Sequence, residues 1–343
     1  MPCLHRLNDL KQYLFQLRKY KTYVTAVTLL LAVACSKKAI EQFVGFKSPF
    51  YFPSATYDFS KNQVSKAGFE LGKTLFYDST LSIDNSTSCA SCHMQSAAFT
   101  HHEHSLSHGL NGSLTRRNAP AIMNLAWNNS FMWDGSISKL DLQPVQPFTN
   151  SIEMGETMPN ILKKVNSSGM YRSMFKSAFG TGAATEDQLL KALSQFMAMA
   201  ISNEAKYDSV KRGQAEFSTS EKEGYAIFIQ KCNACHSEPL FTDNSFRNTK
   251  LPPNDLMDSG RYVATRNMND LYKFKVPSLR NLGYTKPYMH DGRFSSIDKV
   301  LEHYNANLFP ITVEERIKIK AFLLTLNDRI FVTNPNFAKG MTH

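Results

Sequence analysis

Apolar residues recur at the spacing of an amphipathic helix in several parts of the chain. Phe69, Leu75 and Phe76 predict one such helix near the N-terminal end. Gly72 lies among them and would let a second helix pack closely, because glycine has no side chain. No long segment of the sequence alternates between apolar and polar residues as a half-buried strand does. The pattern therefore predicts an all-α fold.

Two further helices are predicted to begin at capping boxes, in which a threonine and a residue three positions later cap each other's backbone. Thr185 pairs with Gln188, and Thr312 pairs with Glu315. The first of these helices carries apolar residues at helical spacing: Leu189, Leu190, Leu193, Phe196, Met197 and Ala200. The second carries Ile317, Phe322, Leu323 and Leu326.

A segment of the first half of the chain recurs in the second half without gaps, at a constant separation of 157 positions (277 minus 120). The repeated residues are Pro120, Asn124, Leu125, Met132, Asp134, Gly135 and Leu140, which correspond to Pro277, Asn281, Leu282, Met289, Asp291, Gly292 and Ile297. Trp133 corresponds to His290. The match predicts a tandem duplication.

Each half also contains the motif Cys-x-x-Cys-His, as Cys89-Ala90-Ser91-Cys92-His93 and as Cys232-Asn233-Ala234-Cys235-His236. This is the attachment pattern of haem c. Two thiols one helical turn apart can add to the two vinyl groups of a haem, and the next residue then directs its imidazole to the iron. Two short disulfides or one four-cysteine zinc site are the alternatives, but neither needs a histidine in the same place twice.

The motifs and the repeat together predict two tandem cytochrome c-like domains, each with one covalent haem c. We assign residues 61–160 to the N-terminal haem domain and residues 214–330 to the C-terminal haem domain. Residues 161–213 are expected to form a helical connection that packs on both, and residues 331–343 a tail.

The first 34 residues have the features of a signal peptide. A basic stretch ends at Lys21, and the apolar run from Tyr23 to Ala34 is too short to span a bilayer comfortably. Small residues precede Cys35, which resembles the bacterial lipoprotein signal, where the cysteine becomes the lipidated N-terminus. A plain signal peptide and an uncleaved anchor are alternatives, and all three place the body outside the cytoplasm. Residues 35–60 are expected to form a tether.

The composition is that of an ordinary globular protein, with 42% hydrophobic and 20% charged residues. The formal net charge is +10, but the first 34 residues hold five basic residues against one acidic residue. Haem propionates would lower the remaining charge. The basic balance therefore gives no case for nucleic acid, and at most favours a mild docking surface for a redox partner.

Several ordered motifs carry a resemblance to a known family. They are Leu71–Asp78, Arg117–Pro120, Trp133–Gly135, Gln143 with Glu153–Gly155, and Val276–Asn281. The chain resembles the bacterial dihaem cytochrome c peroxidases and their relative MauG, the maturation enzyme of methylamine dehydrogenase. The resemblance implies that hydrogen peroxide reacts at the N-terminal haem, held by His93. The C-terminal haem, held by His236, would receive electrons from a small donor such as a c-type cytochrome.

The resemblance also assigns roles to three side chains near the N-terminal haem. Glu153 matches the distal acid of the family, which takes a proton from one peroxide oxygen and returns it to the other. Gln143 would orient the peroxide, and Trp133 matches a tryptophan that relays electrons between the haems. Without the resemblance, an exposed glutamate and a core tryptophan would be the simpler interpretations.

Asn118, Thr285 and Pro287 match positions that bind calcium at the domain boundary of the family. An amide and other oxygens suit this hard cation. Ordinary turn chemistry is the alternative for these three residues.

The sixth ligand of each iron distinguishes the subfamilies. Family members activated by reduction place a distal histidine on the catalytic haem, and the matching residue here is Leu110. His108 lies two residues away, and a loop with His101, His102 and His104 precedes it, so a shifted ligand stays open.

On the second haem, Tyr304 stands where these members have methionine, and it resembles the tyrosine ligand of MauG. A packed tyrosine is the alternative, with His303 or Met289 as rival ligands. In the repeat, Tyr304 corresponds to Pro147, which cannot bind iron. This difference would leave the first haem open to peroxide and the second closed by a phenolate.

We therefore expect a periplasmic, lipid-anchored dihaem peroxidase of the cytochrome-c peroxidase type. A dihaem electron carrier, in which His108 or a neighbour closes the first iron, is the non-enzymatic alternative. Oxidation of a specific protein substrate, as by MauG, is a third interpretation. A homodimer is compatible with the sequence.

Overall fold

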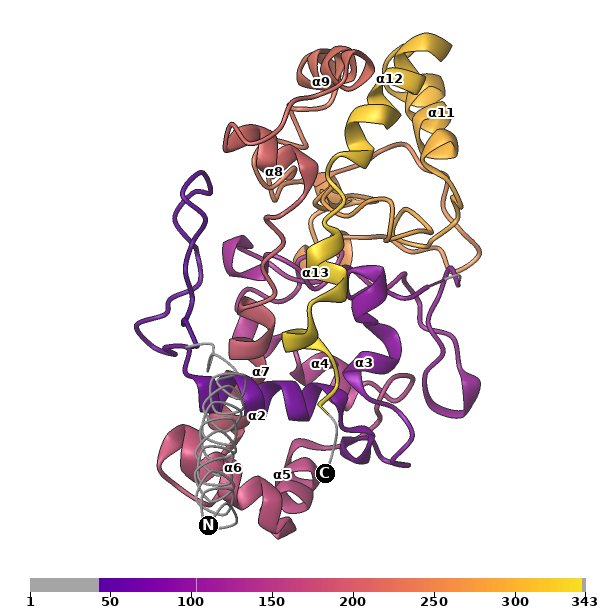
Figure 1. The fold of residues 1–343 in the computed structure, drawn as a ribbon. Coiled ribbons are helices and arrows are strands. Elements are labelled where there is room, and N and C mark those ends of the chain that lie inside the picture. The colour runs from indigo at the N-terminus through magenta and orange to yellow at the C-terminus, as the bar shows by residue number, and fades with distance from the viewer. Residues whose placement is uncertain (1–42, 103, 341–343) are drawn as a thin grey trace, which may run out of the picture. The chain divides into compact units, whose positions relative to one another are not determined.

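Helices form most of the regular structure of residues 43–102 and 104–340, which are the residues that this computed structural model describes (Figure 1). The predicted signal segment of residues 1–34 and Cys35 lie outside the described residues. The α-helices are α2 Lys66–Tyr77, α3 Cys89–Cys92, α4 Val145–Thr149, α5 Met158–Ser167, α6 Gly169–Phe179, α7 Glu186–Ala198, α8 Lys206–Lys211, α9 Thr219–Lys231, α10 Tyr262–Thr265, α11 Ile297–Asn307, α12 Val313–Leu324 and α13 Arg329–Thr333.

Short 3-10 helices and one small ribbon complete the secondary structure. The 3-10 helices are η1 Ser79–Leu81, η2 Gln95–Ala97, η3 Leu110–Gly112, η4 Leu125–Trp127, η5 Leu140–Leu142, η6 Met268–Asp270 and η7 Pro335–Phe337. The strands β1 (Phe246–Arg247) and β2 (Phe274–Lys275) pair antiparallel, with Phe246 opposite Lys275. The fold is thus mostly helical, as predicted. No helix in the described part of the chain is long and apolar enough to cross a membrane.

The predicted helix starts are confirmed. Thr185 and Gln188 form the capping box of α7, and Thr312 and Glu315 form that of α12. Of the apolar residues that this second helix carries, Phe322 and Leu323 are buried, whereas Ile317 is 63% exposed.

Two pairs of closely crossing helices organise the part of the chain from Gly45 onward. Helix α2 packs on α7, and α9 packs on α12. A glycine lies at each crossing: a Cβ atom on Gly72 would lie 1.9 Å from the Ala192 carbonyl oxygen, and one on Gly224 would lie 1.9 Å from the Lys318 carbonyl oxygen. The close approach predicted at Gly72 is therefore confirmed. Figure 1 shows α2 and α7 near α5 and α6, and α9 and α12 near α11.

The segments that repeat in sequence also repeat in backbone conformation. An isolated bridge joins Phe131 to Ile137, and another joins Tyr288 to Phe294, the corresponding positions. The backbone φ is positive in the same way at corresponding asparagines and methionines: 54° at Asn124 and 60° at Asn281, then 67° at Met132 and 75° at Met289. The repeated residues therefore build the same local turn twice.

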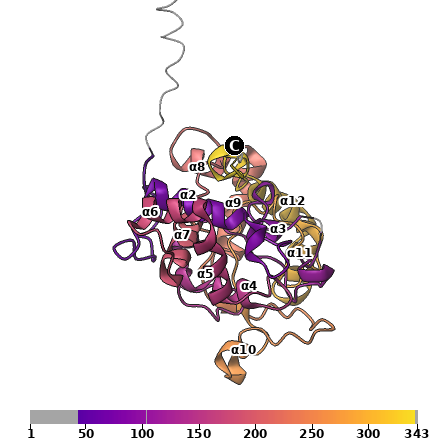
Figure 2. The same ribbon diagram turned by 90° about the horizontal axis from the view of Figure 1, so that it is seen from below.

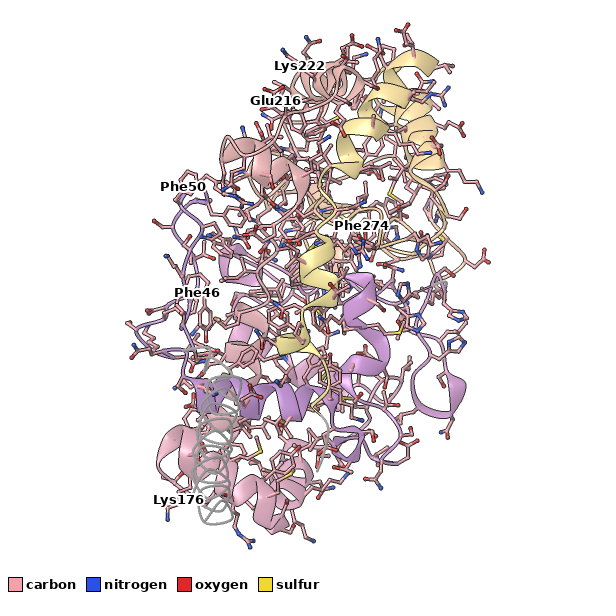
Figure 3. The ribbon with its side chains drawn as sticks, viewed as in Figure 1. Phe46, Phe50, Lys176, Glu216, Lys222 and Phe274 are labelled. Carbon is pink, nitrogen blue, oxygen red and sulfur yellow. The ribbon has the colours of Figure 1, made fainter. Side chains whose placement is uncertain are left out.

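The C-terminal segment returns to the helices of the N-terminal half. Phe337 is 6% exposed, and its ring contacts the rings of Phe69, Phe99 and Phe196. The Gln95 side chain donates to the carbonyl oxygen of Asn334 over 2.7 Å. In Figure 1 this segment, in yellow, passes through α13 and approaches α3. In Figure 3, Lys222 and Lys176 lie toward opposite ends of the view, and Phe274 lies between them.

A fully buried ion pair anchors the loop that leads into the second repeated segment. The Arg280 guanidinium donates to both carboxylate oxygens of Asp208 on α8, over 2.8 Å and 3.0 Å, and Pro239 supplies a carbonyl acceptor at 2.9 Å. Arg280 also lies over the ring of Tyr207. This network fixes the backbone that leads to Asn281.

Candidate active site

The two Cys-x-x-Cys-His motifs share one backbone hydrogen bond, from the histidine N–H to the carbonyl oxygen of the first cysteine over 2.9 Å, although the first motif forms the helix α3 and the second a turn. The Nδ1 atom of His93 donates to the Phe99 carbonyl oxygen over 2.8 Å, and Nδ1 of His236 lies 3.2 Å from the carbonyl oxygens of Phe241 and Pro277. A carbonyl oxygen only accepts, so each Nδ1 carries the proton and each Nε2 keeps a free lone pair. Burial lowers the pKa of both histidines, which favours the neutral ligand form.

The four cysteines of these motifs are free thiols. Cys89 and Cys92 line a small cavity, whereas Cys232 and Cys235 line a larger one. Burial raises the pKa of the Cys89 thiol to about 12 and does the same for Cys232. Because the two cysteine pairs line different cavities, they belong to two separate sites.

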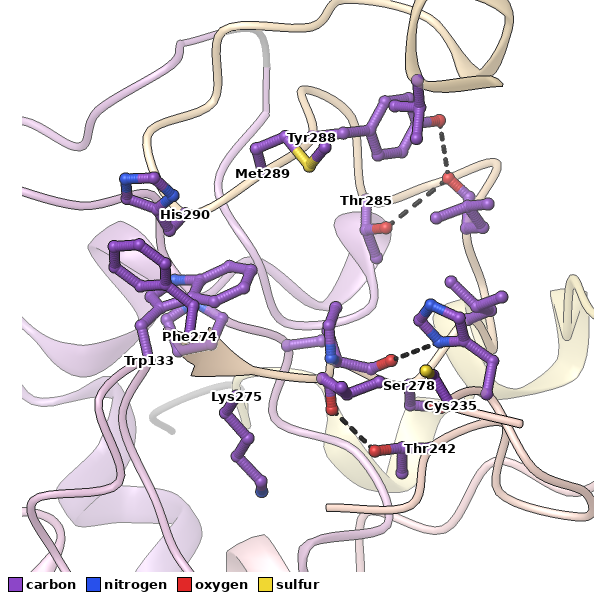
Figure 4. Close-up of a pocket in the computed structure, with 18 of the residues that line it drawn as sticks. Trp133, Cys235, Thr242, Phe274, Lys275, Ser278, Thr285, Tyr288, Met289 and His290 are labelled. Carbon is purple, nitrogen blue, oxygen red and sulfur yellow. Dashed lines mark hydrogen bonds between the residues drawn. The ribbon is translucent and has the colours of Figure 1, made fainter. Parts of the chain in front are cut away.

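The larger cavity has a volume of about 520 Å³, and both His93 and His236 line it. Figure 4 shows part of its wall, from Trp133 to Cys235. Its walls are mainly apolar, and they include Leu282, Leu301 and Tyr304. Among the described residues that line it there is no aspartate or glutamate. A largely apolar cavity with a neutral imidazole and two thiols on its wall suits a flat, covalently attached haem.

The smaller cavity, of about 50 Å³, joins the residues predicted to handle peroxide. His93, Gln143 and Glu153 all line it, although they come from three separate segments. The Gln143 side chain has no hydrogen-bond partner in the described part of the chain. The Asn150 side-chain amide donates to Glu153 Oε1 over 2.7 Å and holds the carboxylate. The structure thus brings together the three residues that the sequence singled out separately.

Burial raises the pKa of Glu153, and the hydrogen bond from Asn150 partly opposes this shift. The carboxyl also lies near enough to Cys89 and Cys92 to raise the pKa of both thiols further. A carboxyl group whose pKa is raised gives up its proton less readily than an ordinary one, which suits a group that must both accept a proton and return it.

Tyr304 faces the larger cavity from α11. Burial raises its pKa to about 12, and the neighbouring Cys232 and Cys235 contribute in the same direction. Its hydroxyl has no hydrogen-bond partner among the described residues. The rival His303 does not line the cavity: its Nε2 pairs with the Thr249 carbonyl oxygen at 2.9 Å. Met289 lines the cavity and stays a rival ligand.

The histidine loop lies beside the first motif, with the His108 carbonyl oxygen 4.0 Å from Cys92 Sγ, but its histidines do not line either cavity. His101, His102, His104 and His108 are absent from the described residues that line either one. The rings of His101, His104 and His108 instead lie near one another, with centroids 5.3 Å and 4.9 Å apart for successive pairs. Leu110 is buried in η3, and Pro147 lines the small cavity.

Trp133 stands at a junction of the two halves of the fold. Its indole Nε1 donates to the Asn118 carbonyl oxygen over 2.8 Å, and its own carbonyl oxygen accepts from the backbone of Lys275 over 2.7 Å. The ring of His290 lies 6.5 Å from the Trp133 ring and stacks on Phe274 at 3.6 Å. Figure 4 shows these rings together at the edge of the larger cavity.

The three residues predicted to bind calcium also line the larger cavity. The Asn118 side-chain amide donates to the Ser105 carbonyl oxygen over 3.0 Å, and the Thr285 hydroxyl lies 3.5 Å from the Leu282 carbonyl oxygen. Pro287 follows a cis peptide bond. Calcium binding by these residues stays a prediction.

Sequence reasoning missed two charged residues that hold this junction. Arg117 donates to Asp134 over 2.7 Å and to both oxygens of Asp258 over 2.7 Å and 2.9 Å. It thereby connects the residue next to Trp133 with the loop before α10, which projects from the other labelled helices in Figure 2. Lys275 lines the larger cavity beside Trp133. Arg117 belonged to a quoted motif, but nothing in the sequence identified its partners.

Comparisons with known proteins agree with this geometry. A model of the di-haem cytochrome c peroxidase family matches residues 66–216. The methylamine utilization protein MauG of Methylophilus methylotrophus is 33% identical over 266 residues, which cover 76% of this chain and 78% of that protein. The cytochrome c551 peroxidase of Nitrosomonas europaea is 34% identical over 269 residues, covering 75% of this chain and 79% of that protein.

Among solved structures, a MauG-like protein associated with microbial copper homeostasis superposes with a TM-score of 0.80 at 27% identity. The match covers 86% of this chain and 99% of that structure. These findings confirm the family that the sequence motifs indicated, and with it the enzyme class of a peroxidase-type oxidoreductase. The chain belongs to the di-haem cytochrome c peroxidase family.

Proposed function

We propose that this protein reduces hydrogen peroxide to water with two electrons from a small redox protein such as a c-type cytochrome. The observation that carries the proposal is the meeting of His93, Gln143 and Glu153 at one small cavity. The reaction joins one peroxide molecule, two electrons and two protons, and it yields two water molecules. We place it in the N-terminal half, residues 61–160.

Two haems c would be held by the cysteine pairs and by the Nε2 atoms of His93 and His236. When bound, they supply iron centres that bind peroxide and exchange electrons. Each of the two histidines has its Nδ1 atom at a backbone carbonyl oxygen, and this shared feature and the repeated turns support an origin by duplication, with one haem in each half.

The residues of the small cavity would manage the protons of the reaction. Glu153 would take a proton from the nearer peroxide oxygen and return it to the departing oxygen, which then leaves as water. The free amide of Gln143 would hold the peroxide in place. Trp133 offers an oxidisable ring at the edge of the larger cavity and would carry electrons from the half that contains His236.

A Glu153→Gln variant tests this assignment, because glutamine keeps the shape but cannot carry the proton. Steady-state peroxide turnover should fall by about 10²-fold or more in protein that still contains both haems. Glu186→Gln, on the exposed start of α7, is the matched control and should keep full turnover. Full turnover of Glu153→Gln would refute the catalytic role.

A MauG-like variant of this function is favoured by Tyr304, which faces the larger cavity from α11. A phenolate ligand would favour the ferric state of the second haem. Tyr304→Phe should therefore change the ferric absorption spectrum of that haem and raise its midpoint potential. Tyr288→Phe is the control, since its hydroxyl is bound to the Leu282 carbonyl oxygen. An unchanged spectrum of Tyr304→Phe would exclude ligation by this tyrosine.

The placement of the histidine loop outside both cavities supports the enzyme over the electron carrier. A carrier would need a side chain that closes the first iron, and His108 does not line either cavity, although its backbone lies beside Cys92. We further propose a periplasmic location with a lipid anchor at Cys35, on the sequence features of residues 1–35. Calcium at Asn118, Thr285 and Pro287 remains part of the proposal.

A further inference from the structure

The larger cavity contains one basic side chain whose charge is not balanced. Lys231, Arg247 and Lys275 are the basic residues among the described residues that line it. Lys231 pairs with Glu315 at 2.7 Å, and Arg247 pairs with Asp243 at 3.3 Å. Lys275 forms no ion pair with any carboxylate in residues 43–102 and 104–340.

The ammonium group of Lys275 is held by neutral groups instead. Its Nζ donates to the Ser130 carbonyl oxygen over 2.7 Å and lies 6.0 Å from the centre of the Phe131 ring. Burial without a carboxylate partner lowers its pKa to about 7. Burying an ammonium group costs free energy unless an anion pairs with it. The position of Lys275 therefore favours the binding of an acidic ligand in this cavity.

Backbone hydrogen bonds hold Lys275 next to β1 and Trp133. Strand β2 pairs Lys275 with Phe246 of β1, and the Lys275 amide donates to the Trp133 carbonyl oxygen over 2.7 Å. In Figure 4 its side chain extends beyond Phe274, away from the Met289 side of the close-up. The backbone of Lys275 is therefore bonded directly to that of Trp133, while its ammonium group lies against Ser130 and Phe131.

A second polar group in the lining also lacks a partner. The side-chain oxygen of Asn244, two residues before β1, is buried and has no hydrogen bond. The oxygen and nitrogen of an amide can exchange places by a rotation. Asn244 could thus present either an acceptor or a donor to a bound group.

We infer that Lys275 is the counter-ion of a haem propionate in the larger cavity. This inference rests on the covalent haems of the proposed function, but not on peroxide chemistry. A haem brings two carboxylates into a lining that offers no acidic residue of its own, and Lys275 is the basic residue there that is free to pair with one. Lys275 would act as a positioning residue: it would hold the propionate at the cavity wall near Ser130 and would supply a positive charge to the haem cavity.

A nearby positive charge disfavours the ferric state, so its loss should lower the midpoint potential of the haem concerned. In Lys275→Met, the ratio of ferrous to ferric haem at the wild-type midpoint should fall about tenfold. Lys275→Arg keeps the charge and should stay close to the wild-type ratio. Lys222→Met, an exposed lysine of α9, is the control and should leave both midpoints unchanged.

The measurement is a spectroelectrochemical titration of both haems, on protein whose haem content is first counted from its alkaline pyridine spectrum. Unchanged midpoints in Lys275→Met would overturn the inference. Should Lys275→Met fail to retain haem, Lys275→Gln replaces it, since glutamine can still donate to Ser130. Equal midpoints in Lys275→Gln and Lys275→Arg would again overturn the inference. Wild-type protein with no covalent haem would instead refute the proposed function.

Discussion

Single residues differ in how far their roles could be predicted from the sequence. The residues predicted to attach the haems are contiguous, so five letters of sequence are enough to suggest their chemistry. Glu153 could be identified only through a family resemblance, which rests on its position in a motif with Gln143 and Gly155. Lys275 could not be found, because the carbonyl group that holds it belongs to Ser130, 145 positions away. Its lack of a carboxylate partner is a property of the fold.

The raised pKa of Glu153 predicts where kcat/KM for peroxide falls on the acid side, or acid limb, of its pH profile. The unprotonated carboxylate must accept the first proton, so kcat/KM for peroxide should fall as the pH drops through this pKa, above the ordinary value of 4.5. Asn150→Ala removes a hydrogen bond that favours the carboxylate and should move the limb upward by about one pH unit.

The raised pKa of Glu153 also determines how its contribution to the stability of the fold changes with pH. Because folding raises the pKa of Glu153, its contribution to stability is present at low pH and is lost as the pH rises through the raised pKa.

Measuring kcat/KM for peroxide over pH 4 to 9 would locate the acid limb of the rate profile in wild type and in Asn150→Ala. A limb that stays in place or moves downward in the variant would show that another group controls it.

Among the elements, helices with local signals were predicted well. The capping boxes at Thr185 and Thr312 begin α7 and α12 where the sequence indicated. The exposure of Ile317 could not be predicted, because the sequence does not show which apolar side chains of a surface helix pack against the core. Strands β1 and β2 were missed, since two residues are too few to show alternation.

The crossing of α2 and α7 predicts a sharp response at Gly72. In Gly72→Ala the new Cβ would overlap the Ala192 carbonyl oxygen, so the helices must separate, and the free energy of unfolding should fall by about 1–3 kcal/mol. Gly169→Ala is the control, because its Cβ would meet no atom closer than 3.9 Å. Urea titration of both variants measures the difference. Equal stability of the two would contradict the tight crossing.

At the scale of the whole molecule, the return of the C-terminal segment could not be predicted. Residues 331–343 were interpreted as a tail, yet Phe337 joins the aromatic cluster of the N-terminal half. The partners lie far apart in sequence: Gln95 binds the carbonyl oxygen of Asn334 across 239 positions. Contacts of this range leave no local pattern, whereas the repeated turn could be predicted because its residues recur in the sequence itself.

Phe337 should therefore contribute to global stability. Phe337→Ala removes a buried ring from this cluster and should lower the free energy of unfolding by about 3–5 kcal/mol. Phe50→Ala, at a site that is 79% exposed, should change it by less than about 0.5 kcal/mol. Thermal unfolding followed by circular dichroism compares the two. A Phe337→Ala protein as stable as the control would mean that this segment does not hold the fold together.

The central claim is that peroxide reacts at the haem of the N-terminal half, beside Glu153. Rapid mixing of the fully oxidised protein with one equivalent of hydrogen peroxide, followed in the Soret band within milliseconds, tests it most directly. The account predicts an immediate spectral change in the oxidised protein, slowed strongly in Glu153→Gln. An absence of change in the oxidised protein and in the half-reduced protein alike would contradict it and identify the molecule as an electron carrier.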